Sequence, residues 1–179
     1  KVCIEGLLLA PATVDLSSAD LVLSKKSEQV SVLKEKINAV DFNQNKLDYI
    51  LIDCPPSLNL LTINALVASD SVLVPLQAEF LPLEGLSQLM LSVKEIRDTA
   101  NPDLRFEGIV LTMFDKRNNL SRQVEEDVRD NLKGLVYQSV IPRSVKLSEA
   151  PSYGKSIFDY SPRSKGAFAY KALALEILS

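Results

Sequence analysis

The 179-residue sequence contains no histidine and only two cysteines, Cys3 and Cys54. The absence of histidine excludes Ser-His and Cys-His nucleophilic catalysis and histidine-ligated zinc, which leaves carboxylates, lysines, arginines and backbone groups for any chemistry. Two cysteines do not make a disulfide framework, so we expect a protein of the reducing cytoplasm. They are also too few and too far apart for a four-cysteine iron–sulfur site.

Long apolar runs are missing too. No segment approaches the about 20 apolar residues that cross a bilayer, and no signal sequence opens the chain, so we expect no membrane association. With 46% hydrophobic and 24% charged residues, the composition fits a globular α/β protein. Without a low-complexity linker or an internal repeat, residues 1–179 are expected to form a single domain.

The net charge of −3 conceals an asymmetry between the two parts of the chain. Residues 1–111 carry 9 basic and 15 acidic side chains, whereas residues 112–179 carry 11 and 8. A solvated surface explains most imbalances of this size. If the protein binds a polyanion, the contact is therefore a local basic patch in the second part of the chain.

Strand-like and helix-like segments alternate along the sequence. Expected strands are Tyr49–Asp53, Ser71–Leu76, Phe106–Thr112 and Leu135–Ile141. Expected helices are one capped by Ser27 with the apolar stripe Val30, Leu33, Ile37 and Val40, then Leu60–Ala68, a stripe from Leu83 to Ile96, Ser121–Leu132 and Lys165–Leu178. This alternation predicts a mostly parallel, twisted sheet with helices on both faces.

The strongest local signal is the segment Tyr49–Ser57. A short apolar run without charge ends on Asp53, and Pro55 and Pro56 prevent the strand from continuing. A carboxylate at the carboxyl end of a buried strand is how phosphate-handling ATPases hold magnesium, usually through a water. The alternative is that Asp53 only caps the following helix.

Two further loops are expected at the same edge of the sheet. One begins at Thr112 and Met113 and continues to Arg117, and the other contains Pro142 and Arg143. In a doubly wound sheet such loops line one crevice, so a nucleotide could place its phosphates near Asp53 and its base against the two later loops.

Many motifs, in order and over nearly the whole chain, are similar to those of the ParA family of chromosome- and plasmid-partitioning ATPases. The segment Ala10–Leu16 is also similar to the part these proteins carry before their Walker B strand. The motifs are IDCPPSL (52–58), LTINAL (61–66), LEGL (83–86), LTMFD (111–115), VIPR (140–143), LSEAP (147–151) and DYSPRSKG (159–166).

The resemblance implies a deviant-Walker ATPase fold that forms a homodimer around ATP and Mg²⁺. The ATP-bound dimer would bind DNA without sequence preference, and a ParB-type partner would stimulate hydrolysis to ADP and release, placing the protein on the nucleoid in the cytoplasm.

The family's site residues can be carried over to matching positions. Asp53 would be the Walker B magnesium residue, with Pro56 and Ser57 in the switch that senses the γ-phosphate. Thr112 and Met113, together with Pro142 and Arg143, would frame the adenine. Arg117 and Lys146 would contact DNA, although scattered basic residues of this kind are also compatible with a solvated face.

One departure from the family is large. These ATPases carry a glycine-rich loop of the form KGGxGKT that cradles the phosphates, whereas the glycines here are isolated, at Gly6, Gly85, Gly108, Gly134, Gly154 and Gly166. The sequence starts at Lys1, which favours an N-terminally truncated ATPase domain that cannot hydrolyse ATP by itself. Without the strand before that loop, exposed backbone edges would make the chain unstable or self-associating.

Two other functions stay open. A membrane-positioning ATPase of the MinD type shares the fold, but it needs a basic amphipathic tail, and the sequence from Leu173 to Ser179 contains one acid and no base. A non-enzymatic dimerisation or adaptor remnant is compatible with the absence of the phosphate-binding loop.

Overall fold

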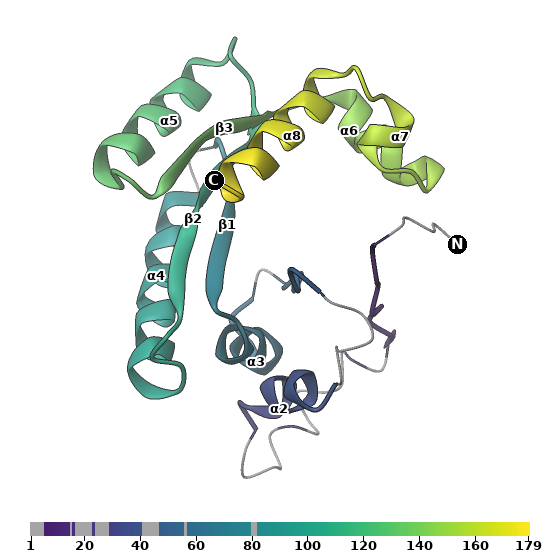
Figure 1. Cartoon of the computed structure of the whole chain (residues 1–179). Helices are drawn as coiled ribbons and strands as arrows, with labels where there is room; N and C mark the ends of the chain where they lie inside the picture. The colour runs from purple at the N-terminus through teal and green to yellow at the C-terminus, as the bar shows by residue number, and fades with distance from the viewer. Residues whose placement is uncertain are drawn as a thin grey trace. The chain divides into compact units, whose positions relative to one another are not determined.

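The computed structural model describes residues 6–14, 16, 23, 29–40, 47–55, 57–79 and 82–179 (Figure 1). The chain divides into two compact units. Unit 1 consists of residues 1–7, 73–89 and 106–179, and unit 2 of residues 8–72 and 90–105.

A three-stranded sheet organises unit 1. Its strands are β1 (Ser71–Gln77), β2 (Arg105–Phe114) and β3 (Val136–Pro142), in the order β1-β2-β3. The strands β2 and β3 run parallel. Three of the four predicted strands are therefore present, and the α/β class with a parallel sheet is confirmed.

Helices separate the strands, as the alternation predicted. They are α2 (Val32–Asn38), α3 (Leu60–Ala68), α4 (Pro82–Thr99), α5 (Asn119–Asn131), α6 (Val145–Glu149), the 3₁₀ helix η3 (Ala150–Tyr153), α7 (Ile157–Tyr160) and α8 (Lys165–Ile177). The helices α2, α3, α4, α5 and α8 lie where the sequence predicted helices. The short elements α6, η3 and α7 were not predicted.

The predicted strand at Tyr49–Asp53 is wrong. Residues 49–55 have no regular secondary structure, and Tyr49, Ile50 and Leu51 are 62%, 48% and 91% exposed. An apolar run becomes a buried strand only when a neighbouring strand bonds its backbone and other elements cover its faces. In the described part of the chain the hydrogen-bonded sheet consists of β1, β2 and β3, so this run has no such partner there.

In unit 2, α2 packs against α3 through a buried amide. The Asn64 side chain donates to the Gln29 carbonyl at 2.7 Å and accepts from the Leu33 N–H at 3.2 Å. The residue that precedes α2 is Ser31, whose hydroxyl donates to the Glu35 carboxylate at 2.6 Å. The predicted cap, Ser27, lies outside the described residues.

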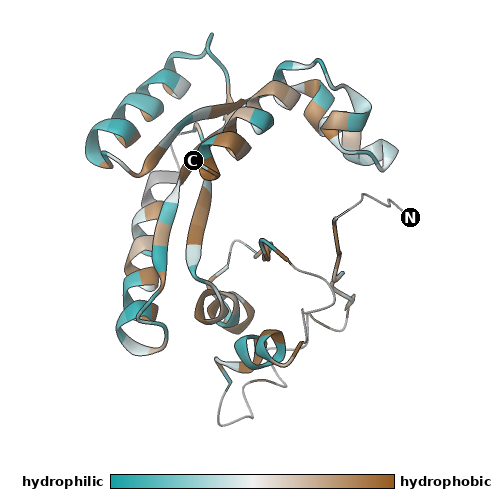
Figure 2. Ribbon diagram, in the orientation of Figure 1, coloured by the Kyte–Doolittle hydropathy of each residue, from teal (hydrophilic) through white to brown (hydrophobic). Residues whose placement is uncertain are grey.

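The core of unit 1 has side chains on both faces of β2. On one face Val110 packs with Ile141 of β3 and Leu173 of α8. On the opposite face Ile109 and Leu111 are fully buried, because successive side chains of a strand alternate between faces. In Figure 2, β1 is mostly hydrophobic, whereas α5 is largely hydrophilic.

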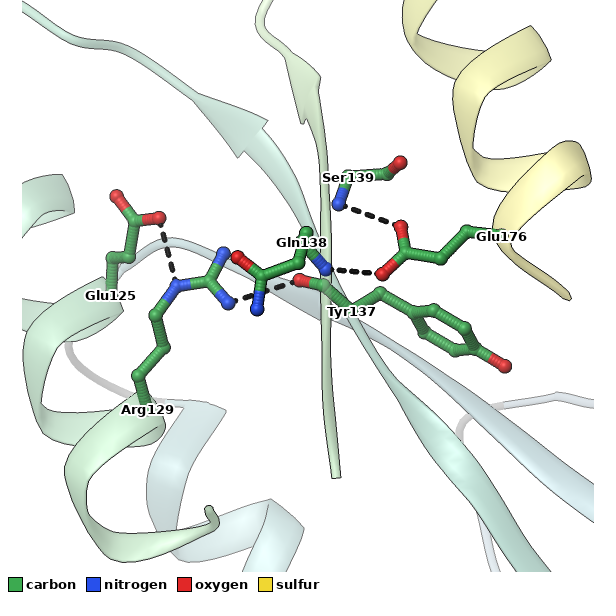
Figure 3. A network of polar contacts seen from close by, with 6 residues as sticks. All are labelled: Glu125, Arg129, Tyr137, Gln138, Ser139 and Glu176. Carbon is green, nitrogen blue, oxygen red and sulfur yellow. Dashed lines mark hydrogen bonds and ion pairs between the residues drawn. The ribbon is translucent and has the colours of Figure 1, made fainter. Parts of the chain in front are cut away.

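The strand β3 carries an irregularity that two helices stabilise (Figure 3). Ile109 pairs with Val136 and Leu111 with Val140, so β3 has two extra residues between these pairs. In this bulge the backbone N–H groups of Gln138 and Ser139 both donate to the Glu176 carboxylate, at 2.6 and 2.9 Å. Arg129 of α5 donates to the Tyr137 carbonyl at 3.1 Å, and Glu125 binds Arg129 at 3.0 Å.

Candidate functional site

The loops that follow the three strands are joined by backbone hydrogen bonds. The Ala78 N–H after β1 donates to the Thr112 carbonyl at 3.0 Å, and the Arg143 N–H after β3 donates to the Phe114 carbonyl at 3.0 Å. We call the ends of β2 and β3, together with the residues that follow the three strands, the ledge (residues 78–79, 112–117 and 142–144). The ledge lies at the carboxyl edge of the sheet, where open α/β sheets bind ligands.

The end of β2 forms the centre of the ledge. The Thr112 hydroxyl donates to the Leu76 carbonyl at 3.3 Å, which holds the half-buried Thr112 side chain against β1. Met113 has a φ of 53°, in the left-handed region that a side chain disfavours. Such a conformation costs of order 1 kcal/mol and persists where its surroundings enforce it, often at binding sites.

A side-chain contact joins the outer loops of the ledge. Arg143 donates to the Glu79 carboxylate at 2.9 Å, and both side chains are about half exposed. Beneath this pair, the buried hydroxyl of Ser121 donates to the Ala78 carbonyl at 3.0 Å, which fixes the loop after β1 against the start of α5. Pro142 is half-buried and pairs in register with Phe114.

Arg117 is held by a carboxylate two residues away. Its Nε and Nη2 donate to the two oxygens of Asp115 at 3.1 and 3.0 Å, and its backbone N–H donates to Asp115 Oδ1 at 3.0 Å. These hydrogen bonds from Arg117 lower the pKa of Asp115 to about 2. The Arg117 side chain itself is 91% exposed.

Lys146 has a comparable arrangement on α6. Its ammonium donates to Glu149 Oε2 at 3.0 Å and lies 5.5 Å from the centre of the Tyr160 ring. The Tyr160 hydroxyl donates to the same carboxylate oxygen at 2.9 Å, and the ring stacks on Tyr153 with 5.1 Å between centres. Hydrogen bonds from Lys146 and then Tyr160 lower the pKa of Glu149.

The residues predicted to hold magnesium and sense the phosphate belong to unit 2. Asp53 is exposed at the end of the irregular segment, and Ser57 accepts a hydrogen bond from the Thr62 hydroxyl through its carbonyl, at 2.6 Å. The side chain of Asn59 caps α3 by accepting from the Thr62 N–H. The alternative that Asp53 caps this helix is therefore wrong.

Only part of the predicted site is assembled within one unit. Thr112, Met113, Pro142 and Arg143 meet on the ledge, whereas Pro56 lies outside the described residues. The nearness of Asp53 and Ser57 to the ledge stays a prediction.

Sequence reasoning missed four contributors to unit 1: Glu79, Ser121, Asp115 and Glu149. The spacings of Asp115 to Arg117 and of Lys146 to Glu149 could have indicated the two local ion pairs. By contrast, Glu79 and Arg143 are 64 residues apart in the sequence, so no local pattern announces their contact.

A fit to magnesium can be judged from the donors present. Among the described residues, no group of three carboxylate or thiol side chains could enclose a metal ion. Magnesium bound with nucleotides commonly takes one or two carboxylates, several waters and phosphate oxygens. The single carboxylate of Asp53 fits that chemistry.

Cys54, the neighbour of Asp53, is exposed. The pKa of its thiol is raised by partial burial and by the charge of Asp53, which disfavours the thiolate.

Comparisons with known proteins show what the chain is similar to. A family model described as an AAA domain matches residues 1–106, more than half of the chain. The sporulation initiation inhibitor protein Soj of Bacillus subtilis is 51% identical over 174 residues, which cover 97% of this chain and 68% of that protein. The chromosome partitioning protein ParA of Caulobacter vibrioides is 46% identical over 179 residues, covering 100% and 67%. The chain belongs to the ParA/Soj family of chromosome-partitioning ATPases.

A solved structure extends the ParA/Soj comparison to nucleotide binding. Cobyrinic acid a,c-diamide synthase from Mycobacterium smegmatis has a TM-score of 0.73 and 35% identity, and was solved with ADP and magnesium and with an ATP analogue and magnesium. The match covers 92% of this chain and 60% of that one. The chain spans about two thirds of the length of the ParA and Soj proteins named above.

In the described residues, no helix has the length and apolar character to cross a bilayer.

Proposed function

We propose that these 179 residues form the base-binding and magnesium-binding part of a ParA-type partitioning ATPase, acting as a single domain. The intact protein binds ATP with Mg²⁺, dimerises, and holds DNA without sequence preference. A ParB-type protein stimulates hydrolysis to ADP and releases the DNA, so the protein works in the cytoplasm at the nucleoid.

The observation that carries this proposal is the ledge. Three loops from three strands are joined at the carboxyl edge of the sheet, with the strained Met113 at the centre, and they contain the residues expected to frame an adenine. Identities of 46–51% to partitioning proteins over nearly the whole chain support the same function. The phosphate-binding loop of the proposed site lies outside the 179 residues, since they contain no glycine-rich segment of that form.

Each residue has a stated task in the proposed complex. The half-buried Met113 and Pro142 contact the faces of the base, and Thr112 and Arg143 line its edge. Asp53 would hold Mg²⁺ through a water, and Pro56 and Ser57 would sense the γ-phosphate. When bound, the metal would neutralise the charge of the phosphates.

The DNA contacts are expected to be electrostatic. Arg117 and Lys146 are exposed cations of unit 1, and both can donate to backbone phosphates. Binding of this kind is indifferent to base sequence and weakens steeply as salt rises.

Nucleotide binding is tested by titrating the 179-residue chain with a fluorescent ATP analogue and Mg²⁺. We expect measurable affinity that falls about ten-fold or more in D53A. The matched control is D48A, which removes an exposed carboxylate from the same irregular segment and is expected to bind like the original chain. Equal affinity of D53A and D48A would refute the role of Asp53.

DNA binding is tested on the natural full-length protein with a random-sequence duplex. Binding is expected with ATP and Mg²⁺, weaker in R117Q and K146Q, and absent with ADP. Equal DNA affinity with and without ATP would count against a partitioning switch. K171Q, which removes an exposed lysine from α8, is the control for a general loss of positive charge.

A further inference from the structure

The two cations that we assign to DNA contact are both occupied by carboxylates of the same chain. Asp115 takes two side-chain donors of Arg117, and Glu149 binds the Lys146 ammonium at 3.0 Å. Each pair is locally neutral. A phosphate that approaches Arg117 or Lys146 therefore meets a carboxylate already in place and is repelled by it.

Other cations of unit 1 differ in this respect. Among the described residues, Lys116, Lys155, Arg163 and Lys165 form no ion pair, and all four are exposed. The occupied cations are thus not the result of a local excess of acid, because residues 112–179 carry 11 basic and 8 acidic side chains.

Both pairs are built so that they can open without moving the fold. Asp115 and Arg117 are two residues apart, and Lys146 and Glu149 are three apart on one short helix. By contrast, the Arg143–Glu79 pair joins two separate loops, so opening it would loosen the ledge. Exposed ion pairs are weak because water and salt screen them, so a nearby phosphate can outcompete them.

We propose that Asp115 and Glu149 compete internally with DNA phosphate for Arg117 and Lys146, so that DNA binding requires both ion pairs to open. This inference rests on the proposed DNA-binding function and adds a regulatory element to it. The two carboxylates lower the affinity of the protein for DNA. Arg117 and Lys146 then contact phosphates only after the other contacts of the complex have brought the DNA close.

The variants D115N and E149Q separate the carboxylate charge from its local structural role. In D115N the new amide oxygen can still accept the Arg117 backbone N–H, and in E149Q the new amide oxygen can still accept the Tyr160 hydroxyl, while the negative charge is lost in both. Both substitutions lie at solvent-accessible positions, and circular dichroism verifies that the fold is retained.

The experiment measures binding of a labelled random-sequence duplex by the natural full-length protein with ATP and Mg²⁺, from 50 to 200 mM salt. We expect each acid variant to bind about two- to five-fold more tightly at fixed salt. The slope of log K against log salt is expected to stay the same, because it counts the phosphates that cations neutralise, and Arg117 and Lys146 contact DNA in both proteins.

Double variants decide whether the gain acts through the paired cation. In D115N/R117Q and E149Q/K146Q the gain is expected to disappear, because no cation remains to be released. E126Q, which removes an exposed carboxylate from α5 that binds neither cation, is expected to leave the DNA affinity nearly unchanged.

Three outcomes would overturn the inference. If D115N and E149Q bind DNA no more tightly while R117Q and K146Q still weaken binding, the DNA-contact proposal stands and the competition is refuted. A gain that persists in the double variants, or equals that of E126Q, shows a general charge effect instead. If no variant binds DNA, the proposed function and the competition both fail.

Discussion

Glu176 shows how one side chain can stabilise an irregular strand. Its carboxylate accepts the consecutive N–H groups of Gln138 and Ser139, which converge because β3 bulges between its paired residues. Hydrogen bonds from Ser139 and the Gln138 backbone, together with the charge of Arg129, lower the pKa of Glu176 despite the opposing effect of burial. The same contact fastens α8 to the edge of the sheet.

The substitution E176Q is expected to lower the free energy of unfolding by about 1 kcal/mol at pH 7, because an amide offers only one acceptor to the two N–H groups. A carboxylate with a lowered folded-state pKa contributes stability above its unfolded value of about 4.5, and loses it as the pH falls through the folded value. Urea unfolding from pH 7 to pH 3 should therefore show the difference between E176Q and the original chain shrinking below about pH 4.5.

E126Q serves as the control for this measurement, because Glu126 is exposed on α5 and forms no ion pair with another described residue. A difference between E176Q and the original chain that stays constant down to pH 3 would show that ionised Glu176 does not supply the stability.

Among the helices and strands, those with a long periodic pattern were predictable. The apolar stripe of α4 places Leu86, Val93 and Ile96 in the core, and α4 ends at Thr99, before Pro102, as expected. The elements α6, η3 and α7 have four or five residues each, too short for a period to be visible. The segment Tyr49–Asp53 has the composition of a strand, but composition cannot supply a hydrogen-bonded neighbour.

The candidate site was predictable to the extent that it follows the strand ends. Thr112 and Pro142 were placed at one edge of the sheet because parallel strands end together. The left-handed conformation of Met113 could not be foreseen, since methionine gives no signal for it. The Glu79–Arg143 contact depends on how two loops approach each other, which is a property of the tertiary structure.

The pairing of β2 with β3 depends on a glycine. A Cβ at position 108 would lie 2.5 Å from Tyr137 Cε2 and 3.2 Å from the Leu135 carbonyl oxygen. We expect G108A to destabilise the protein by about 1–3 kcal/mol, the usual cost of forcing extra volume into a packed site. Chemical denaturation measures the change.

The matched substitution is G85A in α4, where a Cβ would meet nothing within 4 Å. Because alanine favours the helix, G85A is expected to stabilise the protein by up to about 1 kcal/mol. Equal effects of G108A and G85A would show that Tyr137 yields easily and that the close approach of the strands is not required.

Across the chain, the described residues divide into two compact units, whereas the proposed function requires them to act as one domain. The distinction is measurable by hydrogen exchange. In a single cooperative domain, the slowest amides of both units exchange only through global unfolding and report the same free energy.

We therefore expect equal opening free energies for the buried amides of residues 65–67 in α3 and residues 109–111 in β2. The exposed helix α6 supplies fast-exchanging amides as an internal reference. A free energy for α3 that is lower by several kcal/mol would mean that unit 2 opens independently and that the chain contains two domains.

In addition to the side-chain contacts of Ser121 and Arg143, main-chain hydrogen bonds join the ledge, from Ala78 to Thr112 and from Arg143 to Phe114. Such bonds make no demand on the side chains at these positions. Selection can therefore replace the groups that face a ligand while the shape that presents them is inherited unchanged. An architecture of this kind is well suited to diversification, because new specificities can arise by substitution without the scaffold having to be rebuilt.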